Sequence, residues 1–177
     1  MLKLLCTPVG NDGGSATAYS LLDFMFRREY GCDMPLIEKT PAGKPFFPNR
    51  ADIHFSLSHS KTHVLCGLSD RLVGVDIESP RKLNNRIVAF FTSEEESTLF
   101  APLELWVLKE SYIKLIGGTL PSVKSIRFSR DGKQIITPED SVISRLYSID
   151  GCTAAVCSHD AVCPDSIELI CGSCNLF

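Results

Sequence analysis

The chain has 177 residues, a formal net charge of −3, 44% apolar residues and 22% charged residues. This balance is typical of a soluble globular protein, and the length suits one domain or two small lobes that share a core. The acidic balance, the scattered basic residues and the lack of any apolar run near ~20 residues predict no nucleic-acid partner, no membrane partner and a cytoplasmic location.

The first half of the chain predicts one helix and several strands. A strand at 3–7 precedes a helix that Ser15 caps, that runs to Glu29 and that Gly31 ends. Three prolines in 40–48 predict an extended loop. Alternating and β-branched residues then predict three strands of one antiparallel sheet, at 53–57, 62–68 and 72–78. A hairpin turn at 69–71 is predicted between the second and third strands.

The second half predicts helices first and hairpins afterwards. Capping-box spacing at 92–96 starts one helix, and Pro102 opens a longer one that runs to Ile116 and ends at Gly117. Asp-Gly turns at 131–132 and 150–151 predict two hairpins, followed by a last strand at 166–171. Each half then holds a helix and a small antiparallel sheet, so we expect an N-terminal lobe at 1–78 and a C-terminal lobe at 79–177.

Two acidic side chains share one face of the strand at 72–78. The two-residue strand period puts Asp76 and Glu78 on one side and the apolar residues between them on the other. Adjacent carboxylates repel each other unless a cation lies between them, so this pair suits an oxygen-ligated metal. The alternative is a solvated surface pair with no function.

Charged residues also interrupt a helix that is apolar in nearly every direction, 105–116. Glu110 and Lys114 lie one turn apart, and Lys109 falls within the apolar arc. An ordinary surface ion pair is one interpretation of Glu110 and Lys114. Because buried charges need partners, the other interpretation is a site for a metal ion or a pyrophosphate.

A second group of polar residues is suited to phosphate. Ser58 and His59 end a predicted strand, and Lys44 is held by the neighbouring Pro45. Each has an alternative role, His59 as a hydrogen-bonded structural histidine and Lys44 as a surface lysine.

Four motifs occur in one order along the chain. They are Gly43-Lys44-Pro45, the segment from Phe55 to Ser60, the segment from Gly74 to Glu78, and the segment from Trp106 to Lys114. This ordered set resembles the Sfp-type 4′-phosphopantetheinyl transferases over roughly residues 15–160.

The resemblance implies an α+β fold, a pseudo-dimer of two similar lobes, each a helix packed on a small antiparallel sheet, with the active site in the cleft between them. It implies an enzyme that moves the 4′-phosphopantetheine arm of coenzyme A to a serine of an apo acyl or peptidyl carrier protein and releases 3′,5′-ADP, and the length of the chain suggests a monomer. Mg²⁺ would be the metal, held by Asp76, Glu78 and Glu110.

The resemblance also assigns roles to single residues. Glu110 would be the catalytic base and Lys114 a pyrophosphate contact, while coenzyme A would be bound by Lys44, Ser58 and His59. Lys109 would be structural. The carrier protein would dock on an apolar patch that includes Phe90, Phe91 and Leu99, unless these are core residues of the linking helix.

The sequence departs from the resemblance near its start, where only Lys3 precedes Arg27 as a basic residue that could grip the 3′-phosphate. Three other functions remain open. The first is a non-catalytic relative that binds coenzyme A or a carrier protein. The second is a zinc or redox module on Cys171 and Cys174, with Cys163 and His159 as further ligands, although we expect the eight cysteines to be free thiols in the cytosol. The third is a magnesium-dependent phosphate hydrolase.

Overall fold

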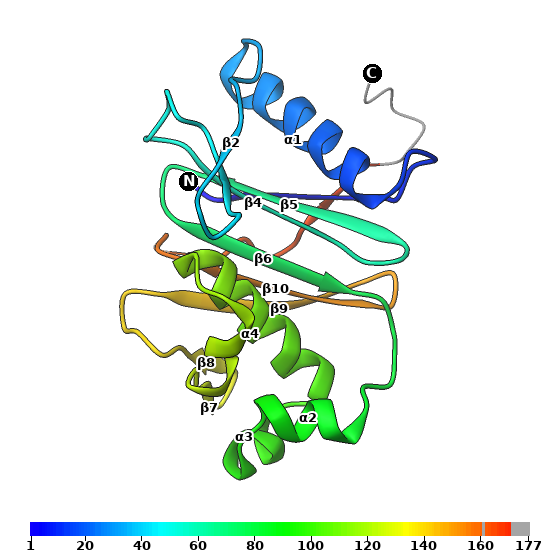
Figure 1. Cartoon of the computed structure of the whole chain (residues 1–177), viewed down its shortest axis with the longest axis vertical. Coiled ribbons are helices and arrows are strands. Elements are labelled where there is room, and N and C mark those ends of the chain that lie inside the picture. Colours follow the sequence, from blue (N-terminus) through cyan, green and yellow to red (C-terminus); the bar gives the residue numbers. More distant parts are fainter. Residues whose placement is uncertain (161, 171–177) are drawn as a thin grey trace.

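The computed structural model describes residues 1–160 and 162–170. The first half of the chain forms one layer of sheet covered by one long helix (Figure 1). The sheet has the strand order β11-β1-β5-β4, and helix α1 (Gly14–Tyr30) packs on it through apolar side chains such as Leu21, Met25 and Phe26. Its strands are β1 (Lys3–Pro8), β4 (His54–His59), β5 (His63–Ser69) and β11 (Glu168–Leu169).

The second half forms another sheet that packs on a different helix. This sheet has the order β6-β10-β9, and helix α4 (Pro102–Ile116) lies against it with Leu108, Tyr112 and Leu115 in its core. Its strands are β6 (Val73–Glu78), β9 (Ile143–Ile149) and β10 (Cys152–Ser158). The predicted α+β class is therefore confirmed.

Strand β6 leaves the sheet in which the sequence predicted it. Strands β4 and β5 pair antiparallel as expected, but β6 pairs with β10 of the second sheet, so the single three-stranded sheet is wrong. The outer edge of β6 faces β4, where the hydroxyl of Ser56 accepts the N–H of Val75 at 3.0 Å and that of Ser58 accepts the N–H of Ile77 at 3.3 Å. Because side-chain hydroxyls replace a ladder here, the turn at 69–71 passes the chain from one sheet to the other instead of closing a hairpin.

The chain also returns from its second half to its first. Strand β11 pairs parallel to β1 at Leu5 and Cys6. It is shorter than the predicted strand at 166–171, whose last residue lies outside the described part. Each sheet therefore contains one strand from the other half of the sequence.

Short elements complete the fold. A ribbon of two strands pairs β2 (Glu38–Lys39) with β3 (Pro45–Phe46), and of these only β3 lies in the segment 40–48 that was predicted to be an extended loop. Helix α2 (Asn85–Phe91), capped by Asn84, was not predicted, nor was the 3₁₀ helix η1 (Leu120–Lys124). Helix α3 (Glu94–Leu99) has the expected capping box, and the hairpin of β7 (Ser129–Asp131) and β8 (Gln134–Ile136) has the expected Asp-Gly turn.

The predicted cap of the first helix is wrong. Gly13 is the N-cap, with φ of 89°, and Ser15 lies inside helix α1. Thr17 replaces the missing side-chain cap, since its hydroxyl accepts the N–H of Gly10 and donates to the carbonyl of Gly13. The helix ends at Gly31, as predicted, and Gly31 adopts the left-handed conformation. Within residues 1–160 and 162–170 no helix has the length and apolar character that crossing a membrane requires.

Candidate functional site

The site is built where helix α4 crosses strand β6 at very close range. A β-carbon on Gly74 would lie 2.0 Å from the carbonyl oxygen of Ser111 and 2.5 Å from the backbone nitrogen of Leu115. Only glycine permits this approach. The contact brings the charged residues of α4 beside the carboxylates of β6, although the two elements are far apart in the sequence.

Asp76 is the most tightly held of these carboxylates. One of its oxygens accepts hydrogen bonds from Lys114 Nζ at 2.8 Å and from the hydroxyl of Ser58 at 2.7 Å. Asp76 is buried, whereas the Lys114 side chain keeps 30% of its exposure. Lys114 therefore pairs with a carboxylate of β6 and not with Glu110 one turn away, so the surface ion pair within the helix is not what forms.

Glu110 is half-buried, and one of its carboxylate oxygens has no compensating partner in the described residues. Its Oε1 atom is enclosed and makes no hydrogen bond in the described part of the chain. Burial raises the pKa of Glu110, the negative charge of Asp76 raises it further, and Lys114 opposes this. An enclosed carboxylate oxygen of this kind costs free energy, which a ligand with positive charge or a proton would recover.

Glu78 completes the acidic group on β6. Its Oε1 accepts a hydrogen bond from Arg81 at 2.7 Å, and its charge also acts on Glu110. The periodicity argument did not identify Arg81, although its place three residues after Glu78 was a usable signal. Two of the three carboxylates, Asp76 and Glu78, are therefore paired with cationic side chains. In the described residues no three side chains of the metal-ligating kinds lie close enough together to bind one ion.

A cavity of about 230 Å³ opens at Lys114, the partner of Asp76, although none of the three carboxylates lines it. Lys44 and Lys114 line it together with Phe55, Ile113 and Gly118, so it lies between strand β4 and the C-terminal end of α4. Lys44 Nζ donates to the carbonyl of Leu115 at 2.8 Å, and burial lowers the pKa of Lys44. The predicted coenzyme A ligand thus lies in the same cleft as Lys114.

Ser58 and His59 differ in their availability. Ser58 is buried, and its hydroxyl is engaged by Asp76 and Ile77. His59 is exposed, and its ring lies against the start of helix α1, where a β-carbon on Gly14 would be 2.6 Å from Nδ1. A helix start and an imidazole side by side are suited to an anion.

Lys109 has the structural position that was expected of it. Its ammonium is fully buried between the carboxylate of Glu96 and the carbonyl of Phe91. In the predicted docking patch, Phe91 is buried and belongs to the core, whereas Phe90 is 45% exposed. The ammonium nitrogen of Lys124 lies 4.3 Å from the centre of the Phe90 ring.

The zinc alternative finds no support in the described residues. Cys163 is buried, and His159 Nδ1 lies 3.1 Å from the carbonyl oxygen of Ser141. Cys171 and Cys174 lie outside the described residues.

Comparisons with known proteins agree with the motifs. The sequence model of the 4′-phosphopantetheinyl transferase superfamily matches residues 72–157. The chain is 33% identical over 145 residues to 4′-phosphopantetheinyl transferase Sfp of Bacillus subtilis, which covers 72% of this chain and 65% of that protein. It is 40% identical over 92 residues to 4′-phosphopantetheinyl transferase gsp of Aneurinibacillus migulanus, and this match covers 46% of this chain and 38% of that protein.

A third relative, the transferase psf-1 of Bacillus pumilus, is 30% identical over 152 residues, covering 76% of this chain and 65% of the relative. The chain therefore spans at most 65% of the length of these relatives. The matched region contains β6, α4 and their carboxylates, and by these similarities the chain belongs to the 4′-phosphopantetheinyl transferase superfamily.

Proposed function

We propose that the protein transfers the 4′-phosphopantetheine arm of coenzyme A to a serine of an apo acyl or peptidyl carrier protein and releases 3′,5′-ADP. The observation that carries the proposal is the enclosed, unpartnered Oε1 of Glu110, whose carboxylate is influenced by the charges of Asp76 and Glu78. Lys114, one turn further along the helix, lines a cavity together with Lys44. The named activity of the relatives agrees with it.

Coenzyme A is the substrate that this cleft suits. Its diphosphate and 3′-phosphate are anionic, and the cleft supplies Lys44 and Lys114, while the exposed His59 lies outside the cleft lining, at the start of α1. The apolar wall of the cavity, which includes Phe55 and Ile113, suits the less polar parts of the molecule. Ser58 is proposed to contact coenzyme A only if its bond to Asp76 opens.

We propose Asp76, Glu78 and Glu110 as the residues that hold Mg²⁺. They fit the ion by donor type, since Mg²⁺ takes carboxylate oxygens, and by the unpartnered oxygen of Glu110. Lys114 and Arg81, which now pair with Asp76 and Glu78, would be freed to contact phosphate oxygens. When bound, the ion supplies charge neutralisation for the diphosphate.

The chain's own groups then have distinct tasks. The hydroxyl oxygen of the carrier serine attacks the β-phosphate, and Glu110 accepts the proton of that hydroxyl, directly or through water. Lys114 stabilises the negative charge that builds on the diphosphate while the bond to the departing 3′,5′-ADP breaks.

The wider setting is proposed on the same basis. The two helix-and-sheet halves would be related as a pseudo-dimer of lobes, near residues 1–78 and 79–177, with the site between them. The protein would act as a cytoplasmic monomer, and the exposed Phe90 of α2 would help to receive the carrier protein.

The test incubates the protein with coenzyme A, Mg²⁺ and a panel of apo carrier proteins, and it reads a phosphopantetheine mass gain on the serine. Glu110→Gln, which keeps the shape and removes the charge, should lower the rate by about 100-fold or more. Glu95→Gln, an exposed residue of α3, is the matched control and should keep the wild-type rate.

Other outcomes separate the alternatives. Coenzyme A binding without any mass gain would make the protein a non-catalytic relative, and release of 3′,5′-ADP without a carrier would make it a hydrolase. A Glu110→Gln variant with full activity would refute the assigned base and metal ligand.

A further inference from the structure

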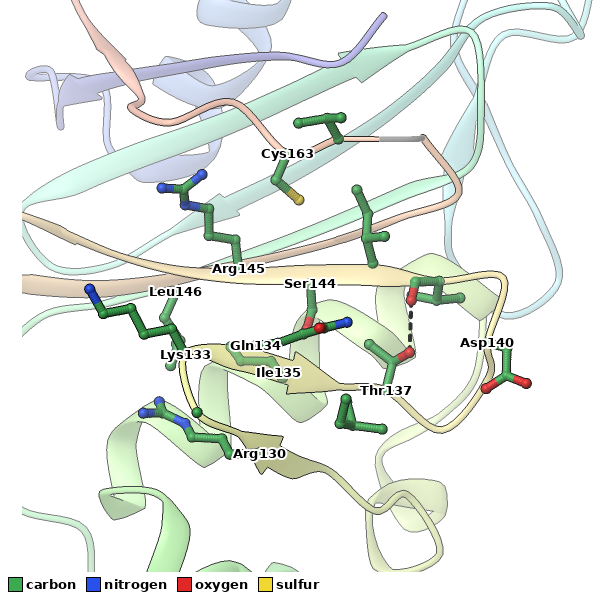
Figure 2. A pocket seen from close by; sticks show the side chains of 15 residues that line it. Arg130, Lys133, Gln134, Ile135, Thr137, Asp140, Ser144, Arg145, Leu146 and Cys163 are labelled. Atoms are coloured by element: carbon green, nitrogen blue, oxygen red, sulfur yellow. Dashed lines mark hydrogen bonds between the residues drawn. The ribbon is translucent and has the colours of Figure 1, made fainter.

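A large hollow lies away from the candidate active site, along the outer edge of β9. It has a volume of about 650 Å³ and shares no lining residue with the cleft at Lys44 and Lys114. The hairpin β7–β8 forms one wall, and Cys163 lies on the opposite side of β9 (Figure 2). Val162, the neighbour of Cys163 in the chain, also lines the hollow. We call this hollow the β9 groove.

The hydrogen-bonding state of β9 follows from the strands beside it. Val75 and Ile77 of β6 donate their N–H groups to the hydroxyls of Ser56 and Ser58, so they do not donate to β10. In an antiparallel ladder the bonded residues alternate. The residues of β10 opposite Val75 and Ile77 therefore direct their backbone groups toward β9.

Those residues of β10 are Val156 and Ala154, and their partners on β9 are Arg145 and Tyr147. Ser144, Leu146 and Ser148 alternate with these residues along β9, so both their N–H and C=O groups must point away from β10. Ser144 and Leu146 line the β9 groove, and Ser148 continues the same edge. Within residues 1–160 and 162–170 no strand pairs with this edge of β9. Strand β8 lies alongside it but pairs only with β7 in a separate ribbon.

The groove walls suit the two faces of an added strand. On the hairpin side, Ile135 of β8 and Leu146 of β9 offer apolar contact, and the enclosed hydroxyl of Ser144 has no hydrogen-bond partner in the described residues. On the opposite side, Val162 and Cys163 offer a second apolar strip. Side chains of an extended peptide alternate between two such walls.

The charges of the groove select the kind of peptide. Three cationic side chains line it, Arg130, Lys133 and Arg145, against one carboxylate, Asp140. This contrasts with the net charge of −3 of the whole chain. Arg145 bonds Asp165 at 2.6 Å, and the Asp165 side chain is 96% exposed, so an incoming carboxylate can compete for Arg145.

We propose that the β9 groove is a docking site for an extended acidic peptide segment of a partner protein, which adds as a strand to the free edge of β9. The seven residues of β9 give room for roughly six or seven peptide residues. Main-chain hydrogen bonds would supply the affinity, and the cationic lining would select acidic sequences with alternating aliphatic residues.

The test uses a fluorescein-labelled, end-blocked heptapeptide of alternating valine and glutamate, with alternating valine and lysine as its comparator. We expect saturable binding of the glutamate peptide that weakens as salt rises from about 0.05 M to about 0.5 M, and weaker binding of the lysine peptide. On binding, the amides of Ser144 and Leu146 should exchange hydrogen more slowly by NMR.

Variants locate the binding. Ser144→Pro removes one outward N–H without touching the ladder to β10, and Lys133→Glu reverses an exposed charge. Each should weaken binding by roughly three- to tenfold, whereas Lys39→Glu on the distant β2 should leave it unchanged.

Three results would overturn the proposal. They are equal binding of the two peptides, no loss of affinity in either variant, and no binding at all. A dimer in sedimentation that Ser144→Pro abolishes would assign the edge to a second copy of the chain and would also overturn it.

Discussion

Lys109→Met should destabilise the protein without changing the chemistry of its folded molecules. The Lys109 side chain is 0% exposed and that of Glu96 is 1% exposed, with 2.9 Å between ammonium and carboxylate. The substitution leaves the buried carboxylate without its cation and the carbonyl of Phe91 without its donor. Removing one partner of a buried pair costs about 3–5 kcal/mol.

The lower end of that range applies here because Glu96 keeps two further partners. Its oxygens accept the backbone N–H of Ser93 at 2.9 Å and that of Phe128 at 3.1 Å. We therefore expect a loss of about 3 kcal/mol in the free energy of unfolding. For a chain of this length that corresponds to a fall of roughly 6–12 °C in melting temperature.

Urea titration followed by circular dichroism measures this loss, and Lys82→Met, an exposed lysine, is the matched control. The double variant Lys109→Met with Glu96→Gln should recover about 1 kcal/mol or more, because a neutral amide costs less to bury than an unpaired carboxylate. A loss below about 1 kcal/mol for Lys109→Met, or no recovery in the double variant, would refute the reasoning.

Three further outcomes are expected. Gly74→Ala should lower the free energy of unfolding by about 3 kcal/mol or more in urea titration, because its β-carbon would meet the carbonyl of Ser111 at 2.0 Å; a wild-type unfolding curve would contradict the close approach of α4. Cys32→Ser should remove one rapidly reacting thiol in a native thiol titration, since Cys32 is exposed whereas burial raises the pKa of Cys6 to about 12; an unchanged count would contradict it.

The third outcome concerns pH. Burial works to raise the pKa of Glu96, but the N–H of Ser93 and the ammonium of Lys109 outweigh it, and the pKa lies below its usual 4.5. A depressed pKa gives stability that is present above 4.5 and is lost as pH falls through the folded value. The stability difference between wild type and Glu96→Gln should thus stay constant from neutral pH to 4.5 and shrink as pH falls further toward the folded pKa, and a difference that stays constant below 4.5 would contradict this.

Local patterns in the sequence were enough to predict the helix and the strand face that contain the candidate site residues. The boundaries of α4 and the left-handed glycines after α1 and α4 follow from proline and glycine chemistry, which acts over a few residues. The strand period likewise put Asp76 and Glu78 on one face. The order of the motifs indicated the family, which the comparisons show.

Local patterns failed where side chains replaced backbone pairing or where a cap lay in an unusual conformation. Hydroxyls of β4 bond the edge of β6, so the third predicted strand joins another sheet. The cap of α1 is Gly13 at positive φ, with Thr17 tying the turn, whereas the sequence rule favoured Ser15. The site roles assigned to single residues stay predictions that the proposed assays test.

By itself, then, the sequence determined which residues carry charge, which elements hold them, and which face of each element they occupy. Only the tertiary structure decided the partners: Lys114 bonds Asp76, 38 positions away, and Lys109 bonds Glu96. The physical reason is that periodicity and capping depend on neighbours along the chain, whereas pairing depends on how closely two elements approach. At Gly74 that approach is set by the absence of a side chain.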